Sequence, residues 1–75
     1  MLSFGEKGTV LIESISRRER EVLHHIIAGR SNQEIASNLG ISINTVKQHT
    51  TNIYGKLGVK RRTQAIARAR AMALL

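Results

Sequence analysis

The sequence predicts a compact all-α domain of four helices with a central helix-turn-helix. Apolar residues recur at helical spacing in four segments, serines stand where three of these segments begin, and glycines follow three of them. No segment shows the pattern of a strand. The chain has 75 residues, which is enough for one domain with a small core.

Residues 1–14 show no clean period and contain two glycines, so we expect a flexible arm or the end of a linker there. The domain proper is expected over residues 15–75. The chain has no cysteine, which excludes disulfides and thiolate metal sites. It also has no basic start followed by a long apolar run. We therefore expect a soluble, cytoplasmic protein without a membrane partner.

The first helix is expected to begin at Ser16, because Ser16 and Glu19 have the spacing of a capping box. Gly29 is expected to end it. A second capping box, Ser31 with Glu34, opens a short helix that ends at Gly40. The predicted inward positions of these two helices are Val22, Leu23, Ile26, Ile27, Ile35, Ala36 and Leu39.

The helix expected from about Ser42 to Leu57 has two chemically different faces when residues are placed 100° apart. Apolar or small side chains form the predicted buried seam of Val46, Thr50, Ile53 and Leu57. The opposite, outer face is polar and without acid, and consists of Asn44, Lys47, Gln48, Thr51 and Gly55. Gly58 and Val59 close this helix, and the last helix is expected from about Arg62 to Met72. The short turn before Ser42 predicts a steep crossing that leaves the outer face uncovered.

The net charge of +7 is unevenly distributed. Residues 1–34 carry five glutamates and five lysines or arginines, whereas residues 35–75 carry seven basic residues and no acid. A half-domain that carries only positive charge attracts a polyanion, either nucleic acid or an anionic membrane. The chain has one tyrosine, one phenylalanine and no tryptophan. It therefore has few of the aromatic side chains on which unpaired bases usually stack. Duplex DNA is the favoured partner.

Four ordered segments resemble the LuxR-type (GerE-like) helix-turn-helix domain of bacterial transcription regulators. They are SRREREVL at 16–23, GRSNQEIA at 29–36, ISINTVKQH at 41–49 and IYGKLGV at 53–59. The resemblance covers roughly residues 14–75. NIYGKLGV and the tail QAIARARAMALL are most similar to the C-terminal domains of large MalT-type ATP-binding regulators. The resemblance implies sequence-specific binding of double-stranded DNA, with the helix from Ser42 to Leu57 in the major groove.

The resemblance also implies roles for individual residues. The base-contacting positions correspond to Asn44, Lys47, Gln48 and Thr51, the four side chains that the helical wheel places outward. The expected phosphate contacts are Asn32, Thr45, Lys56, Arg61 and Arg62. At Arg61 and Gln64 the family commonly has Ser and Glu, so the last helix lacks an N-cap hydroxyl. A weak homodimer on DNA is expected through Ala65, Met72 and Leu74 of the last helix and tail, and RNA polymerase is a further candidate partner.

Two alternatives remain open from the sequence. One is a promoter-reading module like that of an RNA polymerase sigma factor, which shares the same turn. The other is a basic amphipathic module that binds a membrane or a protein through the last helix. No catalytic constellation or cofactor site is predicted, because the chain has no Cys, no Asp and no Gly-rich phosphate loop. No metal site is expected, because no two histidines share a helical face with a carboxylate at ligand spacing.

Overall fold

The computed structural model describes residues 15–72, which contain four α-helices. They are α2 (Arg17–Ile27), α3 (Asn32–Leu39), α4 (Ile43–Leu57) and α5 (Arg62–Ala71). Each helix lies within about one residue of its predicted bounds, and no strand occurs between residues 15 and 72. The all-α prediction is confirmed. The predicted arm, residues 1–14, lies outside the described residues.

Local capping explains why the helices begin where they do. Ser16 and Glu19 form the predicted capping box: the Ser16 hydroxyl accepts from the Glu19 N–H at 3.1 Å, and Glu19 Oε1 accepts from the Ser16 N–H at 3.0 Å. Ser31 and Glu34 repeat this arrangement at the start of α3. Gly40 ends α3 in the left-handed conformation, with φ of 68°, which glycine adopts without steric cost. The turn into α4 is therefore set by local chemistry.

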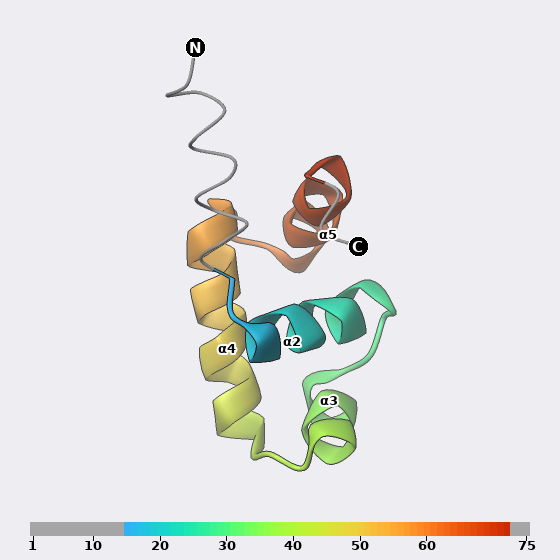
Figure 1. The fold of residues 1–75 in the computed structure, drawn as a ribbon. Helices are drawn as coiled ribbons and strands as arrows, with labels where there is room; N and C mark the ends of the chain where they lie inside the picture. Colours follow the sequence, from blue (N-terminus) through green and yellow to red (C-terminus); the bar gives the residue numbers. More distant parts are fainter. Residues whose placement is uncertain (1–14, 73–75) are drawn as a thin grey trace.

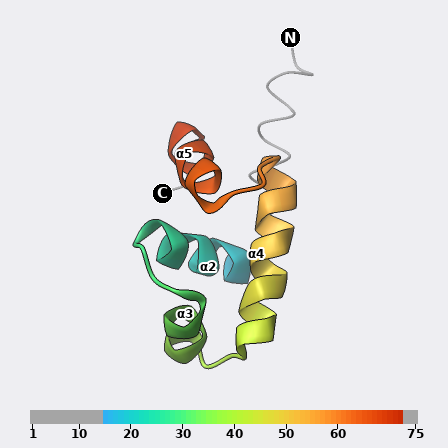
Figure 2. The ribbon, with the colours of Figure 1, turned by 180° about the vertical axis from the view of Figure 1, so that it is seen from behind.

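Helix α4 is the longest of the four and packs against each of the others (Figure 1). Helix α3 lies near its N-terminal end, α2 crosses its middle, and α5 lies near its C-terminal end. The view from behind shows α2, α3 and α5 on the same side of α4 (Figure 2). This arrangement leaves the other side of α4 without a covering helix among the described residues.

The core lies between these helices and contains most of the predicted inward residues. It consists of Ile15, Val22, Leu23, Ile26, Ile35, Ala36, Val46, Ile53, Leu57, Ala65 and Ala69. The predicted inward residues Ile27 and Leu39 are half-buried against it. Thr50, the remaining residue of the predicted seam, is half-buried, and its hydroxyl oxygen is buried without a hydrogen-bond partner. Burial of the seam fixes α4 by one face and turns its other face outward.

Candidate nucleic-acid interface

The candidate interface is built on α4, whose two ends are fixed by caps. At the start, the Ser42 hydroxyl accepts from the Thr45 N–H at 3.0 Å and lies 2.9 Å from the Thr45 hydroxyl. Behind this cap, Ile41 and Val46 occupy the two positions of a hydrophobic staple, and both belong to the core or pack against it. At the end, Gly58 takes the left-handed conformation with φ of 70°. The helix is thus a defined platform from Ile43 to Leu57.

The four predicted base-contacting side chains lie together on the outer face of α4. Asn44, Lys47, Gln48 and Thr51 are all exposed, whereas Val46 and Ile53 on the opposite face are fully buried. No described helix covers this outer face (Figures 1 and 2). The face presents an amine, two amides and a hydroxyl, all of which can form hydrogen bonds with base edges. Its exposure leaves these groups accessible to a partner.

Some of the polar side chains beside this face already form hydrogen bonds in helix caps. The Thr45 hydroxyl is tied to Ser42, and the Ser31 hydroxyl accepts from the Glu34 N–H at 3.1 Å. Asn32 is half-buried at the first position of α3. The N–H groups at the start of this helix lie at the positive end of its dipole, where an anion is favoured.

Lys56 is engaged within the protein. Its Nζ donates to Glu19 Oε1 at 2.7 Å, in an ion pair between α4 and α2. The side chain of Glu19 is only 7% exposed, so this carboxylate depends on its partner. Burial raises the pKa of Glu19, but the hydrogen bond and charge of Lys56 and the hydrogen bonds from Ser16 outweigh it and leave the pKa lowered. In this structure Lys56 joins α2 to α4, and its expected phosphate contact stays a prediction.

Arg62 has a similar structural position. Its Nη2 donates to the carbonyl oxygens of Ile26, at 3.3 Å, and of Arg30. These carbonyls lie at and just beyond the C-terminal end of α2, where backbone acceptors lack helical partners and a cation is favoured. This guanidinium attaches the start of α5 to the end of α2, and the expected phosphate contact of Arg62 stays a prediction.

Arg61 is exposed and forms the N-cap position of α5. Its side chain makes no capping hydrogen bond, in agreement with the loss of the hydroxyl predicted from the sequence. Gln64 compensates in part, because its Oε1 accepts from the N–H groups of Lys60 at 3.0 Å and Arg61 at 3.1 Å. Of the two adjacent arginines, Arg61 is the exposed one and Arg62 the one that is bound internally.

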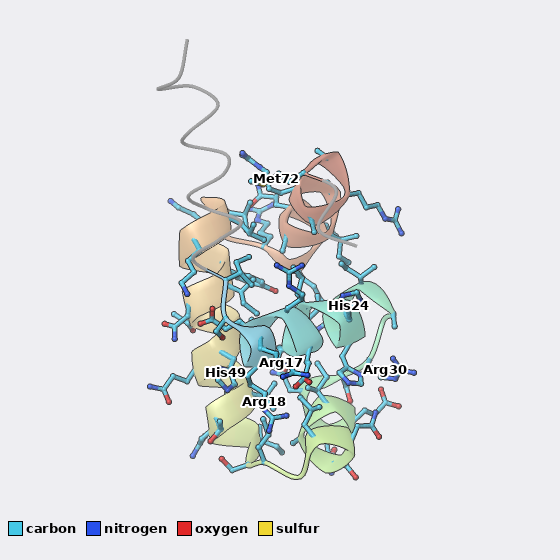
Figure 3. The ribbon with its side chains drawn as sticks, in the orientation of Figure 1. Arg17, Arg18, His24, Arg30, His49 and Met72 are labelled. Carbon is cyan, nitrogen blue, oxygen red and sulfur yellow. The ribbon has the colours of Figure 1, made fainter. Side chains whose placement is uncertain are left out.

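The residues expected at a dimer contact are placed differently from the prediction. Ala65 is fully buried in the core, because α5 is attached with Ala65 and Ala69 inward. Ala65 itself therefore presents no exposed surface to a second copy in this structure. Met72, labelled in Figure 3, is half-buried against the core at the end of α5. Leu74 lies outside the described residues.

The three histidines are not gathered into a site. Figure 3 shows His24 on α2 and His49 on α4, with Arg17 and Arg18 of α2 on the same side of the molecule as His49. His25 Nδ1 lies 3.3 Å from Arg30 Nη1. Within residues 15–72, no three His, Cys, Asp or Glu side chains are placed to hold a metal ion. No helix in this part of the chain has the length and apolar character needed to cross a membrane.

Sequence reasoning missed one residue of this region. Ile43, the first residue of α4, is 40% exposed, more than any other large apolar side chain in residues 15–72. The signal was present in the helical wheel, because Ile43 falls at the border of the buried seam and is one turn from Lys47.

Comparison with known proteins gives a family match over most of the described residues. Residues 13–69 match the model of "Bacterial regulatory proteins, luxR family". In a solved structure, the response regulator ChrA of a heme-sensing two-component system, the similar region has a TM-score of 0.80 and 47% sequence identity. It covers 83% of this chain and 31% of that one.

Curated relatives are regulators from several bacteria. The chain is 50% identical over 56 residues to the probable transcriptional regulatory protein SgaR of Hyphomicrobium methylovorum, covering 75% of this chain and 26% of SgaR. It is 48% identical over 60 residues to the putative HTH-type transcriptional regulator YhjB of Escherichia coli K12, covering 80% of this chain and 30% of YhjB. It is 51% identical over 61 residues to the response regulator VraR of Staphylococcus aureus, covering 81% of this chain and 29% of VraR. The chain thus spans less than a third of the length of these relatives.

Proposed function

The chain belongs to the luxR family of bacterial regulatory proteins, and from this premise we propose that it binds double-stranded DNA sequence-specifically as the DNA-binding module of a transcription regulator. The observation that carries the proposal is the outer face of α4, where Asn44, Lys47, Gln48 and Thr51 are exposed together. A helix with this face fits the major groove, with its N-terminal residues toward the base edges.

Base reading is assigned to these four side chains by their chemistry. Lys47 donates to guanine O6 and N7, and Gln48 pairs with adenine through its amide, which accepts from N6 and donates to N7. Asn44 and Thr51 extend the hydrogen-bonding surface by one turn at either side. Because the face carries no acid, it also meets the negative potential of the groove without repulsion.

Phosphate contacts position the helix without reading sequence. We assign them to the exposed Arg61, to Thr45 and to the N–H groups of α3 that begin at Asn32. Lys56 and Arg62 complete the proposed set, and because both also donate to acceptors inside the domain, they would contribute to stability as well. The acid-free charge of residues 35–75 supports long-range attraction to DNA beyond these contacts.

The finer relationships are also proposals. Similarity of residues 52–59 and of the tail to MalT-type regulators supports placing the chain near that branch of the family. A weak homodimer on DNA would use Met72 and the exposed side of α5 beside the α4–α5 turn, instead of the buried Ala65. An open pocket there is lined by Gly58, Val59, Gln64, Ala67, Arg68 and Ala71. RNA polymerase is a candidate partner of the bound regulator, and the bacterial cytoplasm is the proposed location.

The test is a selection of binding sites from a random duplex pool with the 75-residue chain, followed by fluorescence anisotropy on the recovered site. We expect one preferred motif and an affinity that falls linearly with salt on logarithmic axes, with a slope of about −0.9 per phosphate contact. Recovery of no motif would refute the proposal. Equal binding to anionic phosphatidylglycerol vesicles would favour the amphipathic module, and stable association with core RNA polymerase would favour the sigma-like reading.

A further inference from the structure

The exposed Ile43 calls for an explanation that packing does not provide. It is 40% exposed at the first position of α4, although burying an isoleucine side chain is favourable. The start of α4 does not depend on it: the hydrophobic staple uses Ile41 and Val46, and the cap uses the Ser42 side chain. The exposed part of this side chain is therefore available to a partner while the cap and the staple hold the start of the helix.

The direction of the side chain places it at the leading end of α4. Cα–Cβ bonds in an α-helix tilt toward its N-terminus, so the side chain of a first residue leans beyond the helix end. Ile43 is also one turn before Lys47, on the same flank of the helix. In a helix-turn-helix complex, the N-terminal residues of the recognition helix meet the base edges. Ile43 would then lie in the groove ahead of Lys47.

The chemistry of the groove identifies a single partner for such a group. Three of the four bases present only hydrogen-bonding atoms and ring edges in the major groove, whereas thymine also presents its 5-methyl group. A branched aliphatic side chain facing an amine or a carbonyl oxygen would desolvate that group without pairing it. Against a methyl group, it would remove apolar surface of both partners from water.

We infer that Ile43 specifies a thymine by packing against its 5-methyl group, at a position of the site next to the base read by Lys47. This inference rests on the proposed function and adds to it a specificity-determining residue that reads without hydrogen bonds. It also predicts that the preference for this thymine persists when hydrogen-bonding side chains on the outer face of α4 are replaced.

The experiment uses the site selected by the 75-residue chain and replaces each thymine in turn by deoxyuridine, which lacks only the methyl group. We expect one replacement per recognition helix to weaken wild-type binding by about threefold to tenfold. Ile43→Ala is expected to lose a similar factor on the thymine duplex and to bind the thymine and deoxyuridine duplexes equally. Ile43→Val, which keeps the branched Cβ, is expected to retain most of the discrimination.

Controls separate this inference from its premise. Ser37→Ala, at an exposed position of α3, should discriminate the two duplexes as the wild type does, and thermal unfolding should show Ile43→Ala to be folded. If a preferred site exists but deoxyuridine is tolerated at every position, or if Ile43→Ala still discriminates, the role of Ile43 is refuted while the DNA-binding function stands. If the wild type selects no site, both fail.

Discussion

Glu19 and Lys56 lie 37 positions apart in the chain and form an ion pair of 2.7 Å between the first turn of α2 and the last turn of α4. The same carboxylate closes the capping box with Ser16. One side chain therefore starts a helix and attaches it to the recognition helix, and it is the most buried charged group in residues 15–72.

Removal of Lys56 should destabilise the domain. Lys56→Ala leaves the Glu19 carboxylate buried without its cation, and we expect a loss of about 1–3 kcal/mol in the free energy of unfolding. Urea denaturation measures it. The matched control is Arg18→Ala, which breaks an exposed pair with Glu21 and should cost less than about 1 kcal/mol. Equal losses in the two variants would contradict a stabilising role for the buried pair.

Stability should also depend on pH through Glu19. The pKa of this carboxyl is lowered in the folded protein, so its contribution is complete above the unfolded-state pKa of about 4.3 and is lost as the pH falls through the folded-state pKa. Wild type should therefore lose more stability than Glu19→Gln between pH 6 and pH 3. Urea midpoints across this range measure the difference, and parallel curves would show that Glu19 is not responsible.

The two neighbouring arginines should separate stability from DNA binding. Arg62→Ala removes donors from the carbonyls of Ile26 and Arg30 and should cost about 1–2 kcal/mol of stability. Arg61→Ala should leave stability nearly unchanged and reduce the salt slope of DNA binding by about one contact. Denaturant titration and salt-dependent anisotropy check both variants. The reverse pattern would make Arg62 the stronger phosphate contact of the two.

The outer face of α4 should control preference among sequences. Lys47→Ala and Gln48→Ala are expected to fold normally, because both side chains are exposed, and to reduce discrimination at one base pair each by about 1–3 kcal/mol. Competition with single-base variants of the selected site measures this change. A uniform loss on every sequence would identify the altered residue as a phosphate contact instead.

Ala65 and Ala67 offer a direct test of how α5 is oriented. Ala65→Leu introduces a large side chain into the core and should cost about 1–3 kcal/mol, whereas Ala67→Leu, at an exposed position, should be nearly neutral for stability. Thermal unfolding distinguishes them. If Ala65→Leu instead left stability intact and altered association, the original dimer assignment would be restored.

These variants also mark where sequence reasoning was sufficient. The starts of α2 and α3 were predictable, because Ser16 with Glu19 and Ser31 with Glu34 cap their helices through contacts three residues apart. The outer face of α4 followed in the same way from helical spacing. Such features depend only on neighbours in the chain.

The contacts that sequence reasoning did not foresee depend on distant parts of the chain. Lys56 and Arg62 look like free cations in the sequence, and their acceptors lie 37 and 36 positions away. The burial of Ala65 was not predicted, because the second half of α5 alternates alanine with arginine and periodicity did not show which alanines point inward. Tertiary packing, which no local pattern encodes, decided these three cases.

The division of α4 into a packed seam and an uncovered face has an evolutionary consequence. Under the proposed function, substitutions at Asn44, Gln48 or Thr51 would alter the DNA sequence that the domain prefers and leave the core intact, because these side chains are exposed and lie outside the core. A lineage would then be able to acquire a new operator by single substitutions while the fold is preserved. The same separation makes this helix a suitable scaffold for reprogramming the set of genes that such a domain addresses.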